Sequence, residues 1–96
     1  MYKMKILQEA ISAVMEETEV EQEMILSNNK QEEIVDARYI LVKVLNEQGL
    51  YPIQISHLSG ICLRSINKFL LGFSERSNTR KIMRINYERV RKKLGI

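Results

Sequence analysis

Apolar residues recur every three or four positions along this 96-residue chain, and this spacing predicts helices. A first helix is expected over residues 3–17 and a shorter one over residues 19–26, before a polar Ser-Asn-Asn loop at 27–29. The longest helix is expected over residues 31–48, and Gly49 should end it. No run alternates with the β-branched and aromatic residues of a strand. The sequence therefore predicts an all-α fold, a compact domain of five or six helices.

The helix expected over residues 31–48 is apolar on two faces. One face holds Ala37, Ile40, Leu41, Val44 and Leu45. The other, on roughly the opposite side, holds Val35, Tyr39 and Val42. A helix with two apolar faces is buried on two sides, so we expect it at the centre of the domain. A dimer contact through Val35, Tyr39 and Val42 is the alternative explanation.

Residues 52–72 have the pattern of a helix-turn-helix. Pro52 suits the first turn of a helix, where its missing N–H costs nothing. The tripeptide at 59–61 should form the turn, because its central glycine favours the positive φ of a sharp bend. The second helix is expected over residues 62–71, with Gly72 closing it. Such a motif usually places its second helix in the DNA major groove, and a purely structural hairpin is the alternative.

After this motif, residues 74–78 should form a polar loop. Asn78 or Thr79 is expected to cap a last helix that runs to about Leu94. The apolar stripe of this helix consists of Met83, Tyr87, Val90 and Leu94. The length of the chain predicts a single domain over residues 1–96.

Charge is distributed unevenly along the chain, whose formal net charge is +3. Residues 1–36 carry three bases and nine acids, a net charge of −6, whereas residues 37–96 carry twelve bases and three acids, a net charge of +9. The basic part contains the predicted helix-turn-helix, which matches the electrostatic footprint of a phosphate-binding surface. A solvated basic tail is the alternative, since eight of the twelve bases follow residue 75.

The second helix of the motif turns a polar set outward. If Ile66 faces the core, Arg64 and Lys68 lie about 160° away from it around the helix axis. Ser65 and Asn67 flank them at about 100° from Ile66. Arg pairs with guanine and Asn with adenine, whereas Ser and Lys serve bases or phosphates. We therefore expect Arg64 and Asn67 to contact bases and Lys68 to contact phosphate, and a solvated polar face is the alternative.

Two further groups complete the predicted interface. Leu63 lies at the edge of the polar set, where it either touches a thymine methyl group or packs at the rim. The last helix offers a basic face that could follow the phosphate backbone. Its bases are Arg80, Lys81, Arg84, Arg89, Arg91, Lys92 and Lys93.

An IV-x-AR element stands at residues 34–38, and the segment GLYPIQISHLSG at 49–60 continues as ICLRSINKF at 61–69. Through these segments, residues 11–71 resemble the C-terminal DNA-binding domain of the bacterial replication initiator DnaA. The resemblance implies a small helical domain of the Trp-repressor-like kind. Residues from Ser56 onward are also similar, over less of the chain, to phage repressor-type helix-turn-helix domains.

The resemblance also implies roles for two cations. Arg38 matches an arginine that enters the minor groove in the DnaA family, and Lys30 falls in a basic loop with a similar role. Where the family has Arg-Asp-His-Thr-Thr, this chain has ICLRS at 61–65. Recognition of the initiator's own target box is therefore not implied, and the chain has no ATPase module.

Enzymatic chemistry has little support in this sequence. His57 is the single histidine, and no Ser/His/Asp set, metal-ligand spacing or phosphate-binding glycine loop is present. We expect no catalytic residue, metal or cofactor, and we expect Cys62 to be a buried thiol. The sequence shows no signal peptide and no apolar run near the ~20 residues of a membrane span, which favours a cytoplasmic protein without a membrane partner.

The sequence thus predicts a protein that binds double-stranded DNA, as a bacterial transcription regulator or a protein of a phage or mobile element. The expected DNA contacts are Lys30, Arg38, Leu63, Arg64, Ser65, Asn67 and Lys68. The alternative is a protein-interaction module that uses Leu63, Leu71 and Tyr39 on the same scaffold. A homodimer or a protein partner stays open, because no clear dimer element is visible.

Overall fold

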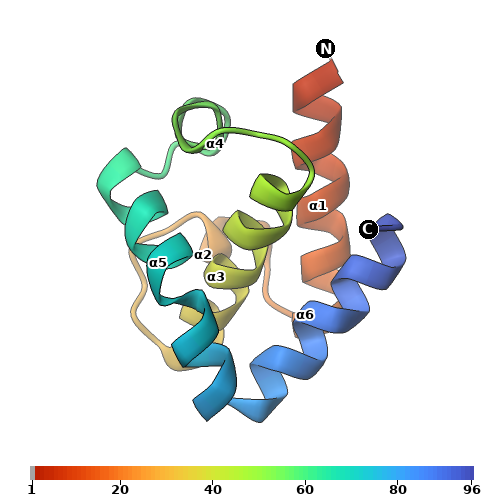
Figure 1. Ribbon diagram of the computed structural model, residues 1–96, viewed down its shortest axis with the longest axis vertical. Coiled ribbons are helices and arrows are strands. Elements are labelled where there is room, and N and C mark those ends of the chain that lie inside the picture. The colour runs from red at the N-terminus through yellow and green to blue at the C-terminus, as the bar shows by residue number, and fades with distance from the viewer. Residues whose placement is uncertain (1) are drawn as a thin grey trace.

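The computed structural model describes residues 2–96, which form helices and no strand (Figure 1). The predicted domain of residues 1–96 therefore has one residue, Met1, outside the described range. The helices are α1 (Tyr2–Thr18), α2 (Gln22–Ile25), α3 (Glu32–Glu47), α4 (Pro52–Ser59), α5 (Leu63–Thr79) and α6 (Lys81–Leu94). The prediction of an all-α domain of five or six helices is confirmed.

Helix α3 lies at the centre, with α1 and α6 on one side and α4 and α5 on the other (Figure 1). Both of its apolar faces are covered within the chain: Leu41 and Val42 are fully buried. The ring of Tyr39 lies 4.7 Å from the ring of Phe69 in α5, centroid to centroid. The prediction of a central helix is confirmed, and Tyr39 and Val42 are not available for the alternative dimer contact.

A tight turn joins α4 to α5. Gly60 has a φ of 80°, a left-handed conformation that glycine adopts without steric cost. The hydroxyl of Ser56 donates to the carbonyl oxygen of Ile61 at 2.6 Å, and the amide of Ile61 donates to the hydroxyl of Ser59 at 3.1 Å. The side chains of the turn thus satisfy backbone groups that the two helices leave open, and the first turn of α5 has a fixed direction.

Helix α5 is longer than the sequence predicts. It continues through Gly72 and through the segment 74–78, which we expected to be a loop. Its inward stripe continues with Phe73 and Ser77, both buried. The last helix begins at Lys81 without a side-chain cap, so the predicted cap at Asn78 or Thr79 is wrong.

The extension of α5 depends on a buried carboxylate of α3. Asp36 is 5% exposed, and its Oδ1 accepts from Nε of Arg76 at 2.8 Å. Arg80, at the junction of α5 and α6, lies 2.8 Å from Asp36 Oδ2 and 3.1 Å from Glu32 Oε1. Hydrogen bonding to Asp36 raises the pKa of the Arg80 guanidinium. These charge-assisted contacts favour a helical last turn of α5 over the loop that its polar residues suggest.

Candidate nucleic-acid interface

The outward face of α5 consists of Leu63, Arg64, Asn67, Lys68 and Leu71. Figure 1 shows α5 along one side of the molecule, and all five residues are exposed. They line a shallow hollow together with Gly72. The opposite side of α5 is anchored in the core by Ile66, Phe69 and Phe73. The structure therefore brings four of the seven predicted DNA contacts onto one solvent-facing surface.

Ser65, the fifth predicted DNA contact, is half-buried, and its side chain forms a hydrogen bond within the first turn of α5. Its hydroxyl lies 3.2 Å from the sulfur of Cys62, and this hydrogen bond lowers the pKa of the Cys62 thiol. Cys62 is exposed, so the expectation of a buried thiol is wrong. The reason is its backbone: with φ −68° and ψ 150°, Cys62 is the N-cap of α5 and not part of the helix. A helical wheel therefore does not apply to it.

Lys30 lies close to the beginning of α5 although it comes from the loop between α2 and α3. A narrow hollow has Leu26, Ser27, Asn28 and Lys30 on one side and Gly60, Ile61, Cys62 and Ser65 on the other. Lys30 is exposed at the rim of this hollow. The structure thus places an exposed cation next to the turn from which the outward face of α5 begins.

Arg38 also lines this narrow hollow, from the side of α3. It is only 5% exposed, and burial lowers the pKa of its guanidinium. Its Nε donates to the carbonyl oxygen of Ile25 at 2.6 Å, Nη2 donates to that of Met24 at 3.1 Å, and Nη1 donates to that of Asn29 at 3.1 Å. Arg38 therefore joins α3 to carbonyl groups of α2 and of the loop that follows it. The minor-groove role that the DnaA resemblance implies is not open to it in this conformation.

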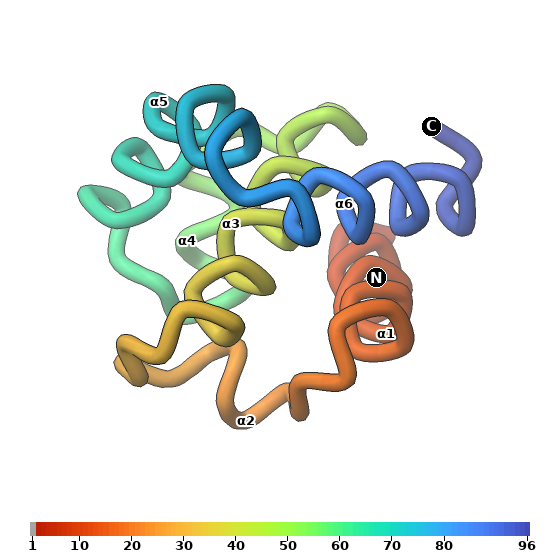
Figure 2. Tube along the Cα trace, turned by 90° about the horizontal axis from the view of Figure 1, so that it is seen from below, coloured from red at the N-terminus to blue at the C-terminus, as the bar shows by residue number. Residues whose placement is uncertain are grey.

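The bases of α6 are partly engaged within the chain. Lys93 Nζ lies 3.0 Å from Glu16 Oε1 and 3.4 Å from Glu17 Oε2, both in α1. Arg91 Nε lies 3.5 Å from Glu47 Oε1 in α3. Helices α1 and α6 pack against each other, and Figure 2 shows α6 lying across α1. The exposed α6 bases outside the ion pairs of the described chain are Lys81, Arg84 and Lys92.

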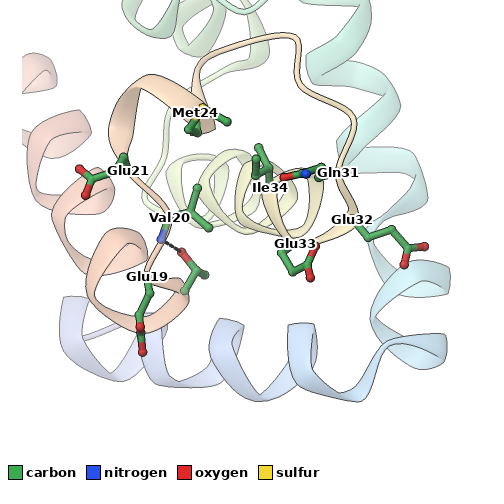
Figure 3. Close-up of a pocket in the computed structure, with 9 residues that line it drawn as sticks. Glu19, Val20, Glu21, Met24, Gln31, Glu32, Glu33 and Ile34 are labelled. Carbon is green, nitrogen blue, oxygen red and sulfur yellow. Dashed lines mark hydrogen bonds between the residues drawn. The ribbon is translucent and has the colours of Figure 1, made fainter.

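A second large hollow is lined by acidic side chains, in contrast to the basic surface of α5. It lies between the end of α1, α2 and the start of α3, and sequence reasoning did not single it out. In Figure 3, Val20, Met24 and Ile34 gather at its middle, while the side chains of the surrounding glutamates point away. These are Glu19, Glu21, Glu32 and Glu33. Carboxylates repel phosphate groups, so this hollow is unsuited to nucleic acid.

No protein-family model, curated protein or solved structure matches this chain. None of the helices formed by residues 2–96 is long and apolar enough to cross a membrane. Within the same range, no three His, Cys, Asp or Glu side chains are grouped so as to hold a metal ion. The chemistry of the α5 surface is therefore the basis on which a function is proposed.

Proposed function

We propose that the protein binds double-stranded DNA, with the first half of α5 in the major groove as the second helix of a helix-turn-helix. One observation carries this proposal: Arg64, Asn67 and Lys68 share one exposed face, and no ion pair of residues 2–96 includes them. Exposed cations without counter-charges are suited to phosphates and guanine edges, and Asn to adenine.

The arrangement of charge supports contact through the first half of α5. Lys30 lies beside the beginning of the helix, where it would meet a phosphate next to the groove. Glu75 is exposed on the same face as Arg64, three turns further along, and would repel the backbone there. DNA contact is therefore proposed for residues 63–71 of α5 and for Lys30. Arg38 would act indirectly, by holding the loop that carries Lys30.

The test is fluorescence anisotropy with a labelled random-sequence duplex over a range of salt concentrations. We expect binding that weakens steeply between about 50 and 200 mM salt, because each neutralised phosphate releases counterions. The double variant Arg64→Ala, Lys68→Ala should bind at least about tenfold more weakly and show a smaller salt slope. The matched control is Lys3→Ala, Lys5→Ala, which removes the same charge from exposed positions of α1. No binding at low salt, or an equal loss in the control, would refute the proposal.

A protein-interaction module is the second candidate, and the exposure of Leu71 favours it. This side chain is 87% exposed, and apolar surface of this kind is typical of binding sites for proteins when it extends into a larger patch. In that case the chain would not bind duplex DNA at low salt. The variant Leu71→Asp would then abolish self-association or partner binding, as measured by sedimentation.

The biological role follows only by analogy. Free-standing modules of the proposed kind regulate transcription or serve phages and mobile elements in bacteria, in the cytoplasm. We propose the same for this protein, as the resemblance to the DnaA domain suggests.

A further inference from the structure

Leu71 is the most exposed large apolar side chain on the described part of the chain. It follows Arg64 by seven residues and Asn67 by four, so the three side chains lie within about 60° of one another around the axis of α5. Leu63, which is 38% exposed, begins the same i, i+4, i+8 ridge. The proposed DNA-reading surface thus has an apolar residue at each end of its central ridge.

The surroundings of the two leucines leave them open to a ligand. They line one hollow with Arg64, Asn67, Lys68 and Gly72. Gly72 lies next to Leu71 and contributes no side chain to cover it. Neither leucine is needed for phosphate contacts, which use cations and hydrogen-bond donors. Phosphate contacts alone therefore do not explain why Leu63 and Leu71 are exposed on this surface.

The major groove offers one apolar group that reports base identity, the 5-methyl group of thymine. We propose that Leu63 and Leu71 bind thymine methyl groups and so give the protein a preference for thymine at two positions of its site. This inference rests on the proposed DNA binding. The two residues are about 12 Å apart along the helix, since each residue rises about 1.5 Å. That distance corresponds to three or four base pairs of about 3.4 Å each, with Arg64 and Asn67 reading the positions between.

The experiment begins with selection of a preferred duplex from a random pool by the full chain. Each thymine of that duplex is then replaced in turn by deoxyuridine, which keeps every hydrogen-bonding edge and lacks only the methyl group. At two positions, three or four base pairs apart, we expect affinity to fall about fourfold, the factor that burial of one methyl group contributes.

Substitutions in the protein assign the two positions. Leu71→Ala should abolish the difference between thymine and deoxyuridine at one position, and Leu63→Ala should abolish it at the other. The control is Ile82→Ala in α6, an exposed apolar residue outside the hollow, which should leave both differences unchanged. Because both leucines are exposed, the unfolding temperature of the variants should stay near that of the unchanged protein.

The outcomes distinguish a failure of methyl-group reading from a failure of DNA binding. A protein that binds duplex DNA equally well with thymine or deoxyuridine refutes the reading of methyl groups and leaves DNA binding intact. The same conclusion follows if Leu71→Ala and Leu63→Ala weaken both duplexes by the same factor. A protein that binds no duplex at low salt refutes DNA binding itself.

Discussion

The guanidinium of Arg38 donates a hydrogen bond to the carbonyl oxygen of Ile25 at 2.6 Å, across thirteen residues of chain. Two further hydrogen bonds to the carbonyl oxygens of Met24 and Asn29 surround this contact. Arg38 thus fastens α2 and the following loop to the central helix. Since Lys30 belongs to that loop, a residue outside the proposed interface determines where one of its cations lies.

We expect Arg38→Ala to lower the free energy of unfolding by about 2–4 kcal/mol, because three hydrogen bonds are lost and the carbonyls of Ile25 and Asn29 lose their donor. Urea denaturation measures this change. Arg64→Ala serves as the matched control: it removes an exposed arginine and should alter stability by less than about 0.5 kcal/mol. A stable Arg38→Ala protein that nevertheless loses DNA affinity would contradict the structural role and favour the minor-groove role.

Gly72 offers a direct test of the length of α5. It lies inside the helix, and a methyl group there would meet Tyr39 at an ordinary contact distance of 3.6 Å. Gly72→Ala should therefore stabilise the protein by about 0.5–1 kcal/mol, the usual gain for alanine over glycine inside a helix. Thermal unfolding followed by circular dichroism gives the answer.

Gly60→Ala is the matched comparison for that variant. Gly60 has open space around it but a φ of 80°, so only its backbone conformation opposes a side chain. Its substitution should destabilise the protein by about 1–2 kcal/mol. If Gly72→Ala were equally harmful, α5 would end at residue 72, as the sequence pattern suggests.

Asp36 should be more important for stability than its acidic neighbour Glu32. Asp36→Asn leaves Arg76 and Arg80 without their buried carboxylate and should cost about 1–3 kcal/mol. Glu32→Gln removes an exposed carboxylate from the same cluster and should cost less than about 0.5 kcal/mol. Chemical denaturation of both variants compares them, and equal losses would show that Asp36 has no special role.

Tyr87 should make the protein sensitive to alkaline pH. Burial and the 2.6 Å hydrogen bond to Glu47 Oε2 raise the pKa of its hydroxyl above the ordinary value of about 10. Above about pH 10 the unfolded chain therefore releases this proton while the folded chain retains it, and stability falls as pH rises. Below that pH the group contributes its full stabilisation.

The variant Tyr87→Phe isolates this effect from other groups that titrate in the same range. It should be about 1 kcal/mol less stable at pH 7, because the hydrogen bond is lost. Its stability should then decline less steeply than that of the unchanged protein above about pH 10. Denaturation curves at pH 7, 9 and 11 provide the comparison, and parallel declines would contradict the assignment.

Periodicity was sufficient to predict those parts of the fold whose burial is set by local spacing. The two apolar faces of α3 and the turn at Gly60 are examples, because each is encoded by residues within a few positions. The length of α5 was not predictable in this way. Gly72 and the polar segment 74–78 weaken a helix locally, and the compensating contact comes from Asp36, about forty residues earlier.

The spacing of apolar residues indicates that Arg38 is buried, although its charge suggests an exposed position. It lies four residues after Ile34 and four before Val42, and both of these residues are buried, so spacing alone places Arg38 on the inner side of α3. A charged residue is seldom buried unless it is paired, which favoured an exposed role. Its partners are backbone carbonyls, and no sequence pattern marks them.

The contacts between α1 and α6 have a practical consequence. Glu16 and Glu17 act as built-in counterions for Lys93, much as a polyanion would. A fragment that begins after residue 18 would lose these carboxylates and uncover the apolar side of the last helix. Such a truncated protein would present Arg89 and Lys93 without their carboxylates, and part of its affinity for DNA would then report the missing helix instead of the recognition surface.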